Sequence, residues 1–252
     1  MWKALAVLAA SVAAVPAAQA LELRACVIEF APWGFYRPQK NGVTEEVGAI
    51  YDMLAEFEHR GPYHVTRMLL PYVRVEVELE RGGCDFAIMA WSNARASYAI
   101  KGSVLVPLEF GVIALKGKPL RSYEDLKDLS IGVARGLKVD ARFDADTSLH
   151  KSYDRDNITG VKKAVMGRTT AVAGSLSTIR WLMTELNVQE RFGDTLVLTS
   201  NDLAVAFSRR AAQLEAASEV NQVFNRMVAD GTIGKIHSKW FGHQPGVSII
   251  GP

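Results

Sequence analysis

The chain has 252 residues, and its 29 basic and 27 acidic side chains leave a formal net charge of only +2, which excludes the broad basic surface that nucleic acid requires. Hydrophobic residues make up 49% of the chain and charged residues 22%, as in a globular protein. Its two cysteines and five scattered histidines have no metal-ligating spacing, so we expect no metal and no other cofactor.

Residues 1–20 are predicted to form a signal peptide. Lys3 provides the positive charge, residues 4–15 form an apolar stretch too short to span a bilayer, and Ala18-Gln19-Ala20 matches a cleavage site. We expect cleavage after Ala20 and export into an oxidising compartment, with an uncleaved anchor as the disfavoured alternative. No later run of 18 apolar residues occurs, so no other segment is expected to cross a membrane.

Cys26 and Cys84 are predicted to form a disulfide, because an even number of cysteines in an exported chain favours pairing. The pairing requires the two residues to lie on neighbouring strands. Two buried free thiols are the alternative.

The mature chain is expected to begin with a strand over residues 21–30. A loop at residues 31–38 follows, because prolines and a glycine interrupt regular structure there. Trp33 and Phe35 lie in this loop. Their rings either plug the edge of the core or form a flat platform for a small ligand.

The next elements predict a parallel sheet. Apolar residues at helical spacing indicate a helix over 45–59, and a strand is expected over 64–70. Residues 73–80, VRVEVELE, alternate like a strand, but Pro71 suits a helix start and a parallel return needs a crossover, so we predict a helix. The apolar run 86–90 is the third strand. This β-α-β-α-β order favours right-handed crossovers in an α/β fold.

Arg95 follows the strand at 86–90 within the polar segment 92–95. Ligands of open α/β sheets bind outside the carboxyl ends of the strands, so Arg95 is placed to hold an anion. A surface arginine on a turn is the alternative.

A second α/β pattern is expected after a break at residues 116–119, which follows an apolar stretch over 104–115. Gly136, between a strand and a helix of this pattern, would let backbone N–H groups face an anion. The predicted elements are a helical turn at 123–126 capped by Ser122, strands at 129–134 and 169–173, helices from about 137 and over 158–166, a helix capped by Ser175 that ends near 186, strands at 196–199 and 202–207, a helix at 214–229 with Val220, Phe224, Met227 and Val228 on its buried face, and a short helix holding Ile233, Ile236 and Trp240.

Six stretches, in order along the chain, carry a family resemblance: FAPWGF (30–35), GAIYD (48–52), ERGGCDFAI (80–88), NARASY (93–98), SYEDLKDLSIGVARG (122–136) and NQVFNRMVADGTIGKIHSKWFG (221–242). Together they resemble the bacterial solute-binding proteins that serve polar amino acid transporters (family 3, the type II periplasmic binding fold). The last stretch is the most specific, and the resemblance covers nearly the whole mature chain.

The resemblance implies an α/β fold of two lobes, each a mostly parallel sheet flanked by helices, joined by a two-strand hinge. Residues 21–111 and 205–252 would form lobe 1 and residues 112–204 would form lobe 2, with hinge strands near 110–115 and 203–207. A ligand would bind between the lobes, and closure would bury it.

By the same resemblance, Arg95 matches the arginine that pairs with the ligand's α-carboxylate, for which a planar guanidinium is well suited. The other matched features are the aromatic platform, the strand end that contacts the ligand and the lobe 2 turn beside the carboxylate, which fall at Trp33 and Phe35, at Trp91 and Ser92, and at Gly136.

Two positions depart from the family pattern. The lobe 2 acid that neutralises a ligand's ammonium group falls at Ser175, and an acid sometimes used in the first strand falls at Val27, with Glu29 as the only nearby substitute. A buried ammonium group without a carboxylate partner is costly. Therefore Glu29 replaces the missing acid, or the ligand is an anion without an ammonium group, or the chain has lost tight binding.

The leading hypothesis is a monomeric, non-catalytic periplasmic protein that captures a small, carboxylate-bearing organic solute and delivers it to an inner-membrane ABC permease or reports it to a sensor. One alternative is a periplasmic accessory or sensor-associated binding module without a transport role. Another is a dehydratase-type enzyme on the same scaffold, for which Glu29 and His64 are the only acid candidates.

Overall fold

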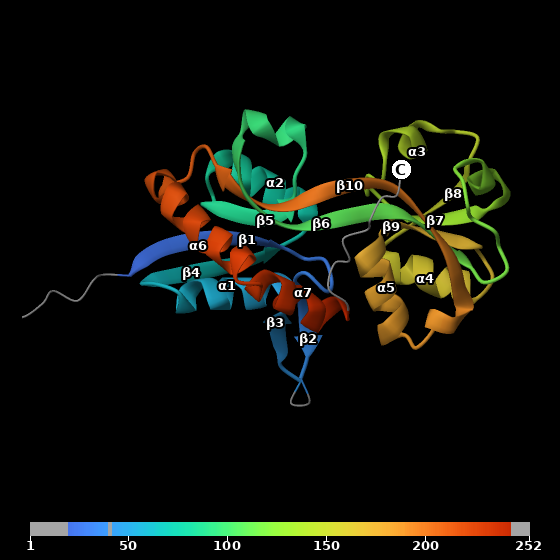
Figure 1. Cartoon of the computed structure of the whole chain (residues 1–252), viewed down its shortest axis with the longest axis horizontal. Coiled ribbons are helices and arrows are strands. Elements are labelled where there is room, and N and C mark those ends of the chain that lie inside the picture. The colour runs from blue at the N-terminus through green and yellow to red at the C-terminus, as the bar shows by residue number, and fades with distance from the viewer. Residues whose placement is uncertain (1–19, 40–41, 243–252) are drawn as a thin grey trace, which may run out of the picture.

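The computed structural model describes residues 20–39 and 42–242 (Figure 1). The predicted signal peptide therefore lies outside the described residues, apart from Ala20. Within the described part of the chain, no helix is long and apolar enough to span a membrane.

An eight-stranded sheet runs through the molecule in the order β4-β1-β5-β10-β6-β9-β7-β8. Helices lie on its faces in two groups, one at each end of the sheet (Figure 1). This is the predicted α/β fold of two lobes. The strands of the sheet are β1 (Leu21–Ile28), β4 (Tyr63–Leu70), β5 (Phe86–Ala90), β6 (Ala99–Leu115), β7 (Ser130–Ala134), β8 (His150–Asp154), β9 (Ala171–Ser175) and β10 (Phe192–Ser208).

In lobe 1 the strands β4, β1 and β5 are parallel, which confirms the predicted β-α-β-α-β order. The crossovers are α1 (Ala49–His59) and α2 (Tyr72–Arg81). The alternating segment at 73–80 is helical because Val75 and Leu79, four residues apart, are fully buried, while Val73 remains 71% exposed. The need for a crossover thus outweighed the alternating pattern.

A hairpin of β2 (Phe35–Pro38) and β3 (Thr44–Val47) stands between β1 and α1, and the sequence analysis missed it. The predicted start of the first helix at residue 45 was wrong for this reason. The helix begins only after Gly48, whose φ of +146° suits glycine. A Cβ at Gly48 would lie 2.3 Å from the carbonyl oxygen of Trp33, so the close approach of the two chains also requires glycine.

The long strands β6 and β10, 17 residues each, pair antiparallel and pass through both lobes. The two short strands predicted at 196–199 and 202–207 are one continuous strand, β10, and β6 begins at Ala99, before the apolar stretch over 104–115. Strand β5 pairs with residues 203–207 of β10, whereas β9 pairs with residues 110–114 of β6. Residues 107–109 and 200–202 therefore pair with each other as a two-stranded ribbon between the lobes, in which Asp202 also accepts the backbone N–H of Trp91 beyond the end of β5.

Lobe 2 contains the parallel strands β7, β8 and β9 with α4 (Asn157–Val165) and α5 (Leu176–Glu185). The predicted helix from residue 137 was wrong, because α3 (Ala141–Ala145) begins after the capping residue Asp140. The expected cap at Ser122 was also wrong. The turn there is a 3₁₀ segment, Glu124–Asp128, and its Asp125 carboxylate accepts the backbone N–H groups of residues 121 and 122.

The C-terminal helices α6 (Ala217–Ala229) and α7 (Thr232–Phe241) return to lobe 1 and pack against α1 (Figure 1). A separate 3₁₀ turn at Leu214–Ala216 precedes α6, so the predicted helix over 214–229 begins three residues too early. Val220, Phe224 and Met227 are buried as predicted, but Val228 is 39% exposed.

The predicted disulfide between Cys26 and Cys84 is confirmed, with the two Cα atoms 5.7 Å apart. Cys26 lies on β1 opposite Ala87 of β5, and Cys84 lies two residues before β5. Both sulfur atoms lie in a small buried cluster with Val75 and Leu79 of α2. The disulfide therefore joins β1 to the segment just before β5, beneath α2.

Candidate functional site

The carboxyl ends of β1, β4 and β5 meet at one edge of the lobe 1 sheet. Ile28 and Leu70 are paired in register at the ends of β1 and β4, and the chain leaves this edge at Glu29, Tyr72 and Trp91. In Figure 1, β1 points along this direction from the outer end of lobe 1 toward lobe 2. The edge is where open α/β sheets bind ligands.

Arg95 lies at this edge in a short 3₁₀ helix (Asn93–Ser97), and only 7% of its surface is exposed. Its Nε donates to Glu76 at 3.0 Å, and its Nη1 donates to the Ala90 carbonyl oxygen at 2.8 Å and to Ser92 Oγ at 2.9 Å. Its Nη2 donates to Tyr72 and to Glu76. A guanidinium has five N–H donors, so internal groups occupy all five.

The Glu76 carboxylate is held in its charged form. Burial acts to raise its pKa, but hydrogen bonds from Arg95 and from the Tyr98 hydroxyl outweigh burial, so the pKa of Glu76 lies below its ordinary value. Burial raises the pKa of Tyr72 to about 12, and burial with the bond to Glu76 raises the pKa of Tyr98. At neutral pH the cluster is thus one ion pair with two neutral phenols.

The two aromatic residues predicted as a platform lie in different surroundings. Trp33 is 5% exposed and packs against Phe241, with ring centroids 4.6 Å apart, so its ring offers little surface to a solute. Phe35 is half-buried at the start of β2, 5.8 Å from the ring of Trp181 in lobe 2. Phe35, unlike Trp33, is therefore placed where the two lobes touch.

The remaining lobe 1 candidates stay near the strand edge. Trp91 is half-buried, and its backbone N–H donates to the carbonyl oxygen of Asp202 on β10. Ser92 is exposed, and its hydroxyl oxygen accepts a hydrogen bond from Arg95. Glu29 is exposed at the end of β1, whereas His64 is paired with Glu22 at the start of the same two strands. The two suggested catalytic groups thus lie at opposite ends of the paired strands β1 and β4.

In lobe 2, Gly136 and Ser175 follow neighbouring elements at the ends of β7 and β9. Gly136 is exposed with φ +79°, but no helix begins beside it, so the expected helix N-terminus is absent at that position. Ser175 is the N-cap residue of α5, as predicted, but its side chain forms no capping bond. Its hydroxyl lies 3.2 Å from that of Ser177.

Glu76 is the functional candidate that sequence reasoning missed at this edge. The sequence did contain a signal for it. Glu76 lies four residues after Tyr72, so a helix in this segment places both side chains on the same face. The sequence does not show that Arg95, 19 residues further on, folds back onto that face.

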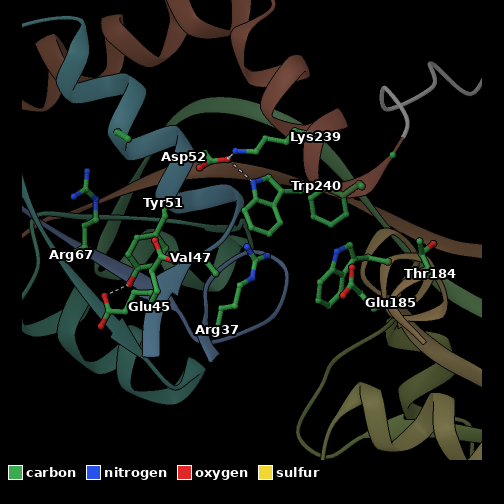
Figure 2. A pocket seen from close by; sticks show the side chains of 15 residues that line it. Arg37, Glu45, Val47, Tyr51, Asp52, Arg67, Thr184, Glu185, Lys239 and Trp240 are labelled. Atoms are coloured by element: carbon green, nitrogen blue, oxygen red, sulfur yellow. Dashed lines mark hydrogen bonds and ion pairs between the residues drawn. The ribbon is translucent and has the colours of Figure 1, made fainter. Parts of the chain in front are cut away.

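A groove of about 740 Å³ lies between the lobes on another side of lobe 1, lined by the hairpin β2–β3, by α1 and α7, and by α5 of lobe 2. Figure 2 shows Arg37 below Trp240, with Tyr51 and Glu45 on one side and Thr184 and Glu185 on the other. None of the strand-edge residues lines it. The sequence offered no signal for this groove, since the hairpin had been interpreted as a loop.

The comparisons place the chain in a family. The sequence model of the bacterial extracellular solute-binding proteins, family 3, matches residues 23–243, and the chain belongs to that family. No curated protein matches the chain.

Solved structures show the same fold at low sequence identity. The ligand-binding domain of AvGluR1 in complex with phenylalanine aligns with a TM-score of 0.73 and 14% identity over 90% of this chain and 97% of that one. An ABC uptake transporter substrate-binding protein from Streptococcus pneumoniae with bound histidine aligns with a TM-score of 0.71 and 16% identity, over 90% of this chain and 95% of that one. A variant of ArgBP from T. maritima aligns with a TM-score of 0.69 and 18% identity, over 88% of this chain and 96% of that one. The family and these structures are ligand-binding proteins.

Proposed function

We propose that this protein is a periplasmic solute-binding protein that captures a small, carboxylate-bearing organic solute between its lobes for an ABC transporter. The family match and the two-lobe fold support solute binding. The observation that supports a carboxylate is Arg95, because its guanidinium at the strand edge already holds a carboxylate, that of Glu76.

In this proposal the solute's carboxylate replaces Glu76 on Arg95. The Nη1 atom of Arg95 donates to the Ala90 carbonyl oxygen and to Ser92, so the guanidinium keeps its orientation when its carboxylate partner changes. The Glu76 side chain is 24% exposed and lies on a helix surface, so it can turn into water. The exchange leaves no buried charge unpaired, which would otherwise cost several kcal/mol.

Closure would occur at the two-stranded ribbon, residues 107–109 and 200–202, where no third strand restrains the pair. Residues 21–111 with 205–252 would move against residues 112–204, and Gly136 and Ser175 would approach the solute from lobe 2. The proposed location is the periplasm, after export by the signal peptide, and the proposed assembly is a monomer that meets an inner-membrane permease.

Calorimetry with small mono- and dicarboxylates and with amino acids tests the proposal. For a solute that binds the wild type, Arg95→Gln should weaken binding at least about tenfold, because charge-assisted hydrogen bonds are lost. Glu76→Gln should strengthen it, because the internal competitor loses its charge. Equal affinity of wild type and Arg95→Gln for every solute that binds would refute the arginine's role.

A second candidate is a binding module that does not deliver a solute, in an accessory or sensor complex. The observation that favours it is the complete internal pairing of Arg95, because the strand edge then needs no ligand. If no solute changes the melting temperature of the wild type or of Glu76→Gln, the transport proposal fails and this second candidate remains.

A further inference from the structure

We infer that the groove between α7, the β2–β3 hairpin and α5 is a second binding site, for a small organic anion with a flat apolar body. This goes beyond the proposed function and does not depend on it. The groove shares no lining residue with the strand edge at Arg95, and its volume of about 740 Å³ lies within the range of small-molecule sites.

Arg37 is the cation of the groove that would bind the anion, because the other two lining cations, Arg67 and Lys239, form ion pairs with Glu58 and Asp52. Its guanidinium carbon lies 5.4 Å from the ring centroids of both Phe35 and Trp240, so two aromatic faces hold it. Its side chain is exposed, and no carboxylate of the described residues forms an ion pair with it. The edge of the guanidinium is thus available to a carboxylate from outside.

The acidic residues on the lobe 1 wall of the groove already have partners. The Gln39 amide donates to Glu45, and the Tyr51 hydroxyl donates to Glu46 at 2.5 Å. Asp52 accepts both the Lys239 ammonium and the Trp240 indole N–H at 2.7 Å (Figure 2). The Lys239 ammonium offsets the charge of Asp52, whereas Glu45 and Glu46 keep their charges and are held by neutral donors.

Lobe 2 completes the site from the opposite wall. Trp181 of α5 lines the groove and contacts Phe35, so rings from both lobes face the space beside Arg37. Glu185 also lies on this wall but is exposed, and water screens its charge. A flat ligand that carries one carboxylate would pair with Arg37 and place its body between Trp181 and Trp240.

Because both lobes line the groove, an occupant would touch both and hold them at the observed separation. The ring contact between Phe35 and Trp181 and the packing of α5 against α7 are contacts between the lobes outside the β6–β10 ribbon. Occupation of the groove would therefore strengthen an existing contact between the lobes.

The test is a titration of the purified protein with benzoate, followed by calorimetry and by tryptophan fluorescence. Benzamide, which has the same shape without the charge, and benzylamine, which carries the opposite charge, are the ligand controls. We expect saturable binding of benzoate with a Kd of about 1 mM or tighter, and binding of benzamide at least about tenfold weaker.

Variants then locate the binding. Arg37→Gln should weaken benzoate binding at least about tenfold and make benzoate and benzamide equivalent. Arg168→Gln, which removes an equal charge from an exposed turn before β9, is the matched control and should bind like the wild type. Arg95→Gln should leave benzoate binding in the groove intact, and thermal unfolding verifies that each variant is folded.

Three results would overturn the inference: no saturable binding of benzoate at concentrations up to about 10 mM, equal binding by Arg37→Gln and Arg168→Gln, or loss of binding in Arg95→Gln alone. The last result would place the anion at the strand edge and support the proposed function instead. If benzoate does not bind in the groove while another solute binds in a way that requires Arg95, the groove inference fails and the proposed function stands.

Discussion

Arg95 and Arg37 both come from lobe 1 and carry the same charge, but their surroundings are opposite. Arg95 is 7% exposed, and all five of its N–H donors bind groups of the protein. Arg37 is exposed and lies beside two aromatic rings that also contact each other, without a carboxylate partner in the described structure. The difference shows that position at a ligand-binding edge does not make an arginine available. The partners that it already has decide that.

The difference also has an energetic side. If one member of a buried ion pair is removed, the other is left as a buried charge without a partner. An exposed guanidinium remains hydrated whether or not it has a partner. Arg95 should therefore stabilise the fold and Arg37 should not.

The largest effect is expected from the disulfide beneath the Arg95 edge. Replacing both Cys26 and Cys84 by alanine should lower the free energy of unfolding by up to about 4 kcal/mol, because the bond closes a long loop in the unfolded chain. The two residues are 58 positions apart. Urea unfolding of the variant and the wild type measures the loss.

The same variant can sharpen the contrast between the two regions. The disulfide joins β1 to the start of β5, the strand that leads to Arg95, and it touches no residue of the groove. Hydrogen exchange should therefore rise around Ala90 and Arg95 more than in the β2–β3 hairpin. A uniform rise across lobe 1 would contradict the local role assigned to the bond.

Arg95→Gln should cost about 3 kcal/mol of unfolding free energy, because Glu76, Tyr72 and the Ala90 carbonyl all lose a charged donor. Arg37→Gln, the same chemical change at the other site, should stay within about 0.5 kcal/mol of the wild type, as exposed positions usually do. Denaturant unfolding of the two variants side by side provides the measurement. A cost for Arg37→Gln as large as that for Arg95→Gln would remove the distinction.

The smallest effect is expected from acid. The folded-state pKa of Glu76 lies below 4.5, so its ion pair contributes stability that is complete above the unfolded value and is lost as pH falls through the folded value. Between pH 5 and acid conditions, the wild type should lose more stability than Glu76→Gln, which cannot titrate there. Unfolding curves of both proteins across this range measure the difference, and parallel pH profiles would show that the pair is not charged.

Much of the fold followed from local patterns and from the rules that connect parallel strands. The burial of Val75 and Leu79 with Val73 exposed agrees with the helix that was predicted from the need for a crossover. The errors have a common source, because β-structure that depends on a distant partner has a weak local signal. Residues 200–201 were interpreted as a gap between two strands, yet β6 pairs with them and makes β10 continuous. Likewise β2 and β3 are strands only because each pairs with the other.

The candidate site was predictable only in part. The end of β5 and the position of Arg95 after it follow from an apolar run and a polar turn. The disulfide was predicted from the cysteine count on condition that Cys26 and Cys84 lie on neighbouring strands, a condition that only the fold could meet. Glu76 is 19 residues from Arg95, and Arg37 is 144 residues from Trp181. Pairings over such separations depend on how the elements pack.

The amino-acid sequence alone therefore indicated the class of fold, a disulfide with two free thiols as the alternative, and the strand that ends before Arg95, because periodicity, cysteine number and chain order do not depend on tertiary contacts. The tertiary structure decided which arginine is occupied. Packing of α2 against β5 brings a carboxylate to Arg95, and packing of α7 and α5 around the hairpin leaves Arg37 beside two rings on the wall of the groove. A guanidinium binds whichever acceptor the fold brings within about 3 Å, and that choice is made by contacts between distant segments.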